Sequence, residues 1–283
     1  MSKWGDYGVP PAQSPFAVHA TIVMHYLNGA YYPVGGAGSI AQSVKTIVAA
    51  QGGRFLLNRE VTEILIENGR AVGVNVRKVN APIESPLETY YAPIIISNTG
   101  GAITYLKLIP ADYPISFRES LRQFVQKYAP TTNVTLYLYL GLADDPRWRS
   151  LPERESLGFQ GENHWIYESI DHDATYEQRK QWIFTDRVPQ CYISFPSLKD
   201  PQATAHTAEI IAWVDYEAFT QWQTQPWLHR DADYQQLKER IGQMLIQQVD
   251  RHYPGFAKLV AYPGPNSRGH FPTASICNSS KRN

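Results

Sequence analysis

The stretch YYPVGGAGSIAQSV, residues 31–44, decides how the fold of this chain is interpreted. Its segment GAGSIA, residues 36–41, fits the pattern G-x-G-x-x-A of dinucleotide-binding turns. In such a turn the glycines let the backbone approach a pyrophosphate that sits at the N-terminus of the next helix. The pattern therefore raises the hypothesis of a phosphate-binding turn.

A helix is predicted directly after these glycines. Apolar residues recur at helical spacing from Ile40 to Val48, Ser39 is in place to cap the first turn, and Gly52-Gly53 ends the pattern. The lead-in NGAYYPV, however, contains Pro33, which a central strand does not tolerate. Two interpretations stay open: a phosphate loop, or a tight turn in which the glycines let the backbone pack closely.

β-Type segments follow this helix in the sequence. Strands are predicted at 54–57, 61–67 and 70–79, and Asn68-Gly69 forms a hairpin turn between the last two. The stretch YYAPIIISNTGG, residues 90–101, is typical of a buried strand that runs into a glycine turn.

The second half of the chain predicts a larger mixed layer. Ser116 and Glu119 have the spacing of a capping box at the start of a helix over 116–128. Strict alternation predicts a strand over 133–142. Further strands are predicted at 164–169, 191–197 and 209–215, and an amphipathic helix over 233–252. Residues 262–283 lose all periodicity and are predicted to be an irregular tail.

Composition limits the classes of function. Among 283 residues, 26 basic and 26 acidic side chains cancel, which argues against nucleic acid as a partner. Cys191 and Cys277 are too few for a disulfide framework or a zinc site. No run is long and apolar enough for a membrane helix, so a cytoplasmic or membrane-peripheral protein is expected. The 18 Tyr, 10 Phe and 7 Trp are enough to line an apolar ligand cavity or to fill an aromatic core.

Residue types with catalytic or metal chemistry do not form a recognisable set. His19 and His25 lie six residues apart, which is not the spacing of metal ligands on one helix. No nucleophile, base and orienting residue occur together, so no metal and no catalytic side chain is assigned.

Several motifs in order resemble one family of flavoproteins. They are GDYGVPPAQSPFAVHATIVMHYLNGAYYPVGGAGSIAQSV, GGRFLLNREVTEILIENGRAVGV, APIIISNTGG, ISFPSLKDP and WQTQPWLHRDADYQQLKERI. Across about residues 5–260 the sequence is similar to the retinol saturase and carotenoid isomerase family, which is related to phytoene desaturases within the amine-oxidase superfamily.

The resemblance implies an α/β (α+β) fold, a part of a two-domain flavoprotein. Residues 1–34 would be a substrate-domain segment, 35–105 a segment of the FAD domain and 106–260 the substrate-binding domain. The irregular residues 261–283 are the expected place of a frameshift. In this family the dinucleotide fingerprint lies upstream of GDYG, so the glycines at 35–38 are expected to be a look-alike, and the chain is expected to be a central fragment.

The same resemblance assigns site residues. FAD would contact Val61, the turn of Asn98, Thr99 and Gly100, and the glycines Gly35 and Gly36. Tyr31 and Tyr32 would border the substrate.

The expected activity is that of an FAD-dependent oxidoreductase that saturates, desaturates or isomerises a double bond of a hydrophobic polyene, either a retinoid or a carotenoid. Peripheral membrane contact fits such a substrate. Two alternatives stay open: a non-catalytic remnant or truncated product that at most binds an apolar lipid, and an enzyme completed by a separately encoded flavin-domain half.

Overall fold

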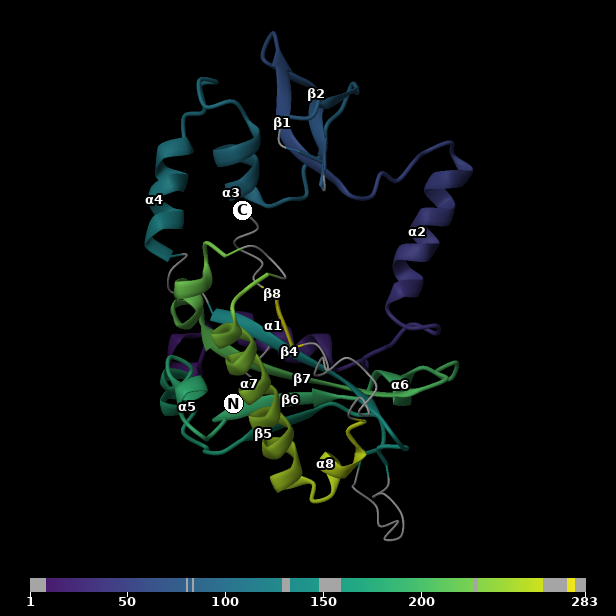
Figure 1. Cartoon of the computed structure of the whole chain (residues 1–283), viewed down its shortest axis with the longest axis vertical. Coiled ribbons are helices and arrows are strands. Elements are labelled where there is room, and N and C mark those ends of the chain that lie inside the picture. Colours follow the sequence, from purple (N-terminus) through teal and green to yellow (C-terminus); the bar gives the residue numbers. More distant parts are fainter. Residues whose placement is uncertain are drawn as a thin grey trace. The chain divides into compact units, whose positions relative to one another are not determined.

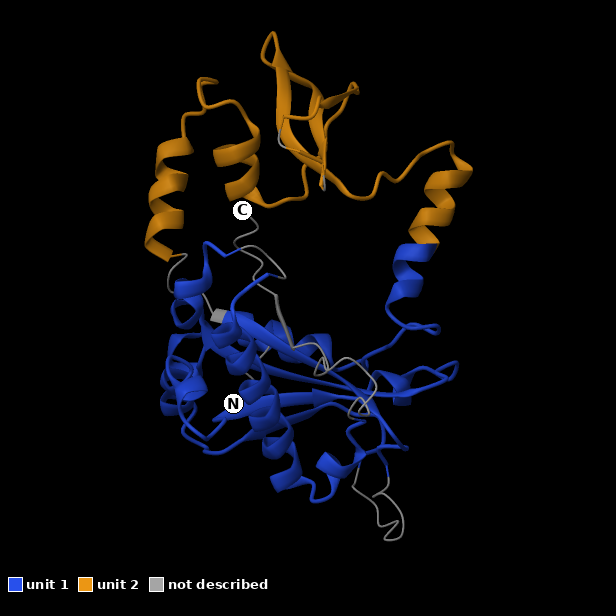
Figure 2. Ribbon diagram, viewed as in Figure 1, with its two compact units in different colours: residues 1–42, 131–283 blue, residues 43–130 orange. Residues whose placement is uncertain are grey.

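The computed structural model describes residues 9–79, 81–82, 84–128, 133–147, 159–225 and 229–261, and the backbone alone of 133 and 274–277. The chain forms two compact units (Figure 2). Unit 1 comprises residues 1–42 and 131–283, and unit 2 comprises residues 43–130. The predicted functional division at 34/35, 105/106 and 260/261 stays a prediction, because compactness does not tell which ligand a unit binds.

Unit 1 is built on a five-stranded antiparallel sheet of order β5-β6-β7-β4-β8 (Figure 1). Its strands are β4 (Asn133–Leu142), β5 (His164–Tyr167), β6 (Gln190–Ser194), β7 (His206–Asp215) and β8 (Ala274–Cys277). Its helices are α1 (Phe16–His25), α5 (His172–Gln178), α6 (Pro196–Lys199), α7 (Ala232–His252) and α8 (Phe256–Leu259), with 3₁₀ turns η1 (Pro11–Gln13), η4 (Trp182–Phe184) and η5 (Tyr216–Trp222).

Strict alternation in β4 explains why the sheet has two different faces. Val134, Leu136, Leu138, Leu140 and Leu142 are all buried, whereas the residues between them are partly or fully exposed. The strand pairs with β7 over its whole length, from Asn133 opposite Asp215 to Leu142 opposite His206. The predicted strand 133–142 is therefore confirmed.

Helix α7 covers the aliphatic face of this sheet and lies in front of it in Figure 1. Asp231 caps its start by accepting a hydrogen bond from the Tyr234 amide at 3.0 Å. A Cβ on Gly242 would lie 3.7 Å from Leu138, which places the helix directly against β4. The helix ends at His252, just before Pro254-Gly255, and Gly255 has a φ of 106°.

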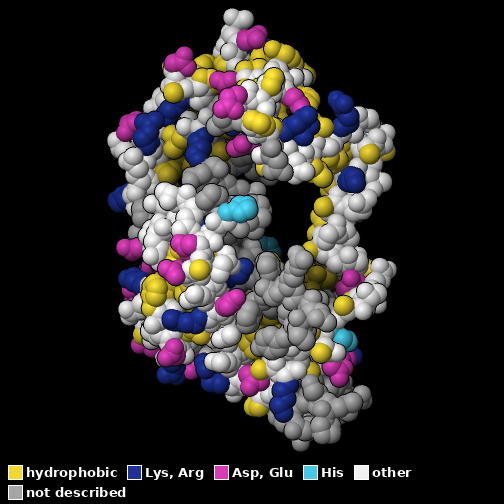
Figure 3. Space-filling model, in the orientation of Figure 1, with side chains coloured by type: hydrophobic (Ala, Val, Ile, Leu, Met, Phe, Trp, Pro, Cys, Tyr) yellow, Lys and Arg dark blue, Asp and Glu magenta, His cyan; other side chains and the backbone are white. Residues whose placement is uncertain are grey.

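Unit 2 contains a three-stranded antiparallel sheet of order β1-β2-β3. Its elements are β1 (Arg59–Glu67), β2 (Arg70–Lys78), β3 (Glu88–Tyr91), α3 (Gly101–Ile103), the π turn η2 (Thr104–Leu108) and α4 (Arg118–Tyr128). Asn68 and Gly69 both have positive φ, 49° and 75°, so the predicted hairpin turn is confirmed. Hydrophobic side chains lie at the surface of this unit (Figure 3).

Helix α2 (Gly38–Ala50) crosses from one unit to the other. The predicted cap was wrong: the helix begins before Ser39, whose hydroxyl donates to the Gly36 carbonyl at 2.8 Å. The predicted end is confirmed, because Gly52 adopts a φ of 76° and the Gly53 amide bonds the Val48 carbonyl at 2.9 Å.

Three further predictions in unit 2 were wrong. Residues 54–57 and 92–97 form no strand and pair with none among the described residues, and β3 ends at Tyr91. Isolated apolar strands need neighbours to satisfy their backbone groups. The capping box does not form either, because Arg122 and Gln123 bind the Glu119 carboxylate and α4 begins at Arg118.

The predicted irregular tail contains one short strand. The backbone of β8 pairs with β4, with Ala274 opposite Leu138 and Cys277 opposite Thr135. The rest of this tail, 262–273 and 278–283, lies outside the described residues.

Candidate functional site

The face of the sheet opposite α7 carries a set of aromatic side chains, here called the aromatic face. Alternation along the strands places on it Trp165 and Tyr167 of β5, Tyr192 of β6, Ile211 and Trp213 of β7, and Tyr137 and Tyr139 of β4. Strand register aligns four of these side chains in one row across the sheet, in the order Trp165, Tyr192, Ile211, Tyr137.

The rings of the aromatic face stack on one another. The Trp165 and Trp213 rings are 5.6 Å apart and nearly parallel, at 9°. Tyr192 meets Trp165 edge-on at 5.0 Å, and the Tyr137 and Tyr139 rings stack at 5.9 Å. All five are less buried than the aliphatic residues under α7. Helix α1 lies on this side, behind the sheet in Figure 1.

A polar cluster lies beside this row. Ser194 and Tyr139 both pair with Glu209, which makes the next row of the same face. Lys199, at the end of α6, donates to Ser194 Oγ at 2.6 Å and also to Asn163 Oδ1. Burial lowers the pKa of Lys199, against the opposing charge of Glu209. Burial also raises the pKa of Glu209, against the opposing charge of Lys199.

The glycine turn is bound to the same place through Asp200. The Gly35 amide donates to Asp200 Oδ1 at 3.0 Å, and the Gln202 amide donates to the same oxygen at 3.0 Å. Gly35 and Gly36 have φ of 84° and 78°, values that side chains with a Cβ rarely adopt. The Gly36 amide bonds the Pro33 carbonyl at 3.1 Å and closes the turn.

This geometry argues against the phosphate-loop interpretation. In a phosphate loop the first amides face a pyrophosphate, but here an internal carboxylate accepts the Gly35 amide. The residues before the turn, 28–33, form no strand.

The structure brings some of the predicted site residues together. Tyr32 lies beside the glycine turn: its hydroxyl would be 4.0 Å from a Cβ on Gly36. The Tyr31 side chain is 91% exposed and donates to the Asn28 carbonyl at 3.2 Å. Tyr31, Tyr32, Gly35 and Gly36 belong to unit 1. The other predicted site residues, Val61, Asn98, Thr99 and Gly100, belong to unit 2.

In unit 2 the predicted cofactor residues lie on exposed backbone. Val61 is opposite Val76 in β1, an edge strand with a bulge between Val61 and Glu63. The turn of residues 98–100 is held by the hydroxyls of Ser97, Thr99 and Thr104, which lie 2.7 to 3.2 Å from one another. Gly100 has a φ of 91°, which requires glycine. The cofactor roles of these residues stay predictions.

The sequence motifs did not single out Asp200, Lys199, Glu209 or the aromatic residues of the sheet. The signals were nonetheless present. An aspartate before a proline in SLKDP is typical of a turn whose carboxylate binds backbone amides. The alternation in strands 164–169 and 209–215 places tryptophans on one face and aliphatic residues on the other. What the sequence could not give is the order of the strands.

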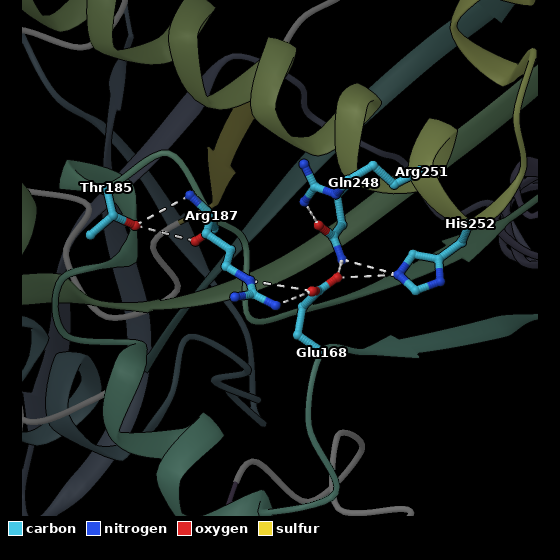
Figure 4. A network of polar contacts seen from close by, with 6 residues as sticks. All are labelled: Glu168, Thr185, Arg187, Gln248, Arg251 and His252. Atoms are coloured by element: carbon cyan, nitrogen blue, oxygen red, sulfur yellow. Dashed lines mark hydrogen bonds and ion pairs between the residues drawn. The ribbon is translucent and has the colours of Figure 1, made fainter.

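A second polar network fixes the end of α7 to β5 (Figure 4). Glu168 accepts from Arg187 Nη2 at 2.7 Å, from His252 Nε2 at 3.2 Å and from the Gln248 amide, whose oxygen in turn accepts from Arg251. Burial alone would raise the pKa of Glu168, but these hydrogen bonds outweigh it and hold the pKa at about 2. A carboxylate whose hydrogen bonds come from several neighbouring side chains has a structural role.

Cys191 lies buried near this network as a free thiol, and burial, aided by the charge of Glu168, raises its pKa far above the usual range. The thiol is therefore protonated and unreactive. The side chain of Cys277 lies outside the described residues. No group of three or more metal-binding side chains occurs in the described part of the chain. In the same part, each helix lacks either the length or the apolar character that crossing a membrane requires.

Comparison with known proteins gives consistent relatives, although no family model matches the chain. The sequence is 29% identical to the all-trans-retinol 13,14-reductase of Danio rerio, over 92% of this chain and 42% of that protein. It is 28% identical to the rat (Rattus norvegicus) protein of the same name, over 88% and 40%. The chloroplastic prolycopene isomerase of Daucus carota is 25% identical over 86% of this chain and 34% of that protein.

The chain thus spans about two fifths of the length of the curated reductases that it matches. A solved oxidoreductase from Methanosarcina mazei overlaps 79% of this chain and 40% of its own, with 18% identity and a TM-score of 0.44, too weak an overlap to carry an argument. These sequence relatives confirm the predicted resemblance. Their names are those of enzymes, so the prediction of an enzyme family is confirmed as well.

Proposed function

We propose that this chain, which resembles the family of retinol saturases and carotenoid isomerases, forms the polyene-binding part of an FAD-dependent oxidoreductase. The reaction would saturate or isomerise one double bond of a retinoid or carotenoid, or introduce one. The relatives include reductases, an isomerase and a phytoene desaturase that is 35% identical over 29% of this chain, and by their names these proteins remove, rearrange or introduce double bonds.

The observation that carries the proposal is the aromatic face. A conjugated polyene is flat and apolar, and stacked rings such as Trp165 and Trp213 offer it a flat surface that excludes water. Residues that fill the core of a sheet meet another layer of side chains, as the aliphatic face meets α7. The aromatic residues have α1 on their side of the sheet and are nonetheless partly accessible.

The residues present fit FAD in part. β1 is an edge strand, so main-chain groups near Val61 are able to bind an adenine edge, and the exposed turn at 98–100 is able to lie beside the cofactor. The Gly35 amide is already bound by Asp200, so Gly35 and Gly36 would hold the turn near the substrate and not contact phosphate. When bound, FAD would supply the hydride chemistry, and the aromatic face would position the double bond and exclude water.

Polyene binding by the full chain tests the proposal directly. All-trans-retinol and prolycopene are titrated into the protein with and without FAD, while tryptophan fluorescence reports binding and chromatography reports conversion. Trp213→Leu removes a ring from the aromatic face, and loss of its buried area is expected to weaken binding roughly tenfold. Phe184→Leu is the matched control, because Phe184 is an exposed ring of η4 and is not one of the residues of the aromatic face.

The outcomes separate the candidates. Conversion with FAD supports the enzyme, and conversion only after an added flavin-domain polypeptide supports a separately encoded half. Absence of any polyene binding, or equal effects of the two variants, contradicts the proposed role of the aromatic face.

A non-catalytic lipid-binding protein is the second candidate. One observation favours it: the aromatic face and its polar cluster are complete within unit 1. One relative, 26% identical over 90% of this chain, is named an inactive all-trans-retinol 13,14-reductase. Polyene binding without flavin binding would select this candidate.

A further inference from the structure

Lys199 and Glu209 are two half-buried groups of opposite charge that do not pair. Both residues lie in the described part of the chain, and no ion pair within 4 Å joins the Lys199 ammonium to the Glu209 carboxylate. Glu209 lies on β7, and Lys199 lies on α6, which packs against that strand. Partial burial of unpaired charges costs free energy, and such groups commonly mark a binding site.

The hydrogen bonds of the cluster do not use every donor of Lys199 or the acceptors of Glu209. An ammonium has three donors, and Lys199 uses two of them for Ser194 and Asn163. The Glu209 carboxylate accepts no hydrogen bond from any residue in the described part of the chain. One donor and one acceptor are therefore free at neighbouring positions.

The cluster is continuous with the aromatic face. The row of Ser194, Glu209 and Tyr139 is two residues along the strands from the row of Tyr192, Ile211 and Tyr137, which is about 7 Å on the same face. A ligand lying along the rings would place one end at Lys199 and Glu209. The adjacent Asp200 holds the glycine turn there.

We propose that Lys199 and Glu209 bind the terminal hydroxyl of a polyene alcohol whose chain lies on the aromatic face, an inference that rests on the proposed function. A hydroxyl is a small neutral group that accepts a hydrogen bond from an ammonium and donates one to a carboxylate. An ether oxygen accepts only, and a hydrocarbon terminus does neither. The pair thereby selects alcohols over hydrocarbon carotenoids.

Three ligands that differ only at the terminus test this selection on the full chain. They are all-trans-retinol, its methyl ether, and the hydrocarbon with a methyl group in place of the hydroxymethyl. Tryptophan fluorescence gives the three dissociation constants. The wild type is expected to bind the alcohol roughly tenfold more tightly than the ether, and the ether more tightly than the hydrocarbon, because each step removes one hydrogen bond to a charged group.

Two variants assign the two bonds. Glu209→Met is expected to bring the alcohol-to-ether ratio close to one, and Lys199→Met to bring the ether-to-hydrocarbon ratio close to one. Lys180→Met is the matched control, since Lys180 is an exposed lysine that pairs with Glu177, and all ratios are expected to stay as in the wild type. Each ratio is measured on a single variant, so a reduced folded fraction affects all three ligands equally.

Two results overturn the inference and leave the proposed function standing. One is equal binding of the three ligands by the wild type. The other is an alcohol preference that both Met variants keep, which would place the hydroxyl elsewhere. If none of the ligands binds, the proposed function itself fails.

Discussion

The two units of the molecule differ in how they use apolar residues. In unit 1 the sheet, α7 and α8 share one continuous core in which most large apolar side chains are buried. In the described part of unit 2 only Ile64, Val76 and Leu108 are buried hydrophobic residues. Equally apolar segments lie exposed there, including residues 54–57 and the side chains of Ile94 and Ile96.

This difference shows that an apolar sequence pattern does not by itself produce a packed core. Strand β4 alternates and finds β7 on one side and α7 above it, so its pattern becomes a core. The segment IIIS at 94–97 has strong β propensity but pairs with no strand among the described residues, and it forms no regular secondary structure. A strand is stable only when its neighbours are supplied.

The largest effect expected from this comparison is on a core leucine of unit 1. Leu138→Ala removes a side chain that is 1% exposed and packs below Gly242, so unfolding free energy is expected to fall by about 3 kcal/mol. Urea unfolding followed by tryptophan fluorescence measures this, because all seven tryptophans lie outside unit 2.

The matched substitution in unit 2 is Ile96→Ala, at a side chain that is 88% exposed. It is expected to change stability by less than about 0.5 kcal/mol, measured by hydrogen exchange of unit 2 amides. A large loss at Ile96 would break the comparison, because it would require a buried environment for that side chain.

Sequence patterns predicted most of unit 1 because its elements carry their own signals. The alternation of β4 and the apolar stripe of α7 follow from burial on one face, and both bounds were predicted within a residue or two. The errors in unit 2 concern pairing, since 54–57 and 92–97 have the composition of buried strands without the partners. Propensity does not encode which strands are adjacent.

The candidate site divides in the same way. Tyr32, Gly35 and Gly36 were predicted by resemblance, and the structure adds the contact that holds them, from Gly35 to Asp200, 165 residues along the chain. Lys199 and Glu209 lie near each other because α6 packs against β7, and Glu209 belongs to none of the motifs. Long-range contacts of this kind depend on topology, which one sequence does not state.

The second prediction compares one carboxylate from each unit. The pKa of Glu168 is held at about 2, below its value of about 4.5 in the unfolded chain, so its stabilisation is complete above pH 4.5 and is lost as the pH falls toward 2. Glu168→Gln is expected to cost about 2 kcal/mol at pH 7 and almost nothing at pH 2. Urea unfolding at both pH values measures the difference.

The counterpart in unit 2 is Glu88, whose pKa is lowered by hydrogen bonds from Tyr90 and Arg59 at the surface. Glu88→Gln is expected to have a smaller effect with the same direction, because solvent screens these bonds. An equal loss from both variants would show that the surface network of unit 2 is as rigid as the network around Glu168.

The smallest expected effect concerns glycines, one in each unit, at which an added side chain would meet no close neighbour. Gly35 in unit 1 and Gly69 in unit 2 have positive φ of 84° and 75°, with no atom closer than 3.7 Å to an added Cβ. Gly35→Ala and Gly69→Ala are each expected to cost about 1 kcal/mol, since a left-handed conformation strains any Cβ. Gly38→Ala, at a glycine without positive φ and with open space, is the control and is expected to be neutral or slightly stabilising.

Unfolding detected by tryptophan fluorescence measures the effects at Gly35 and Gly38, and hydrogen exchange of the β1 and β2 amides measures the effect at Gly69. Because this strain is local, the two units are expected to respond alike where glycines are changed and differently only where a core is lost. A much larger cost at Gly35 would mean that the turn bound by Asp200 is stabilised by more than its own backbone.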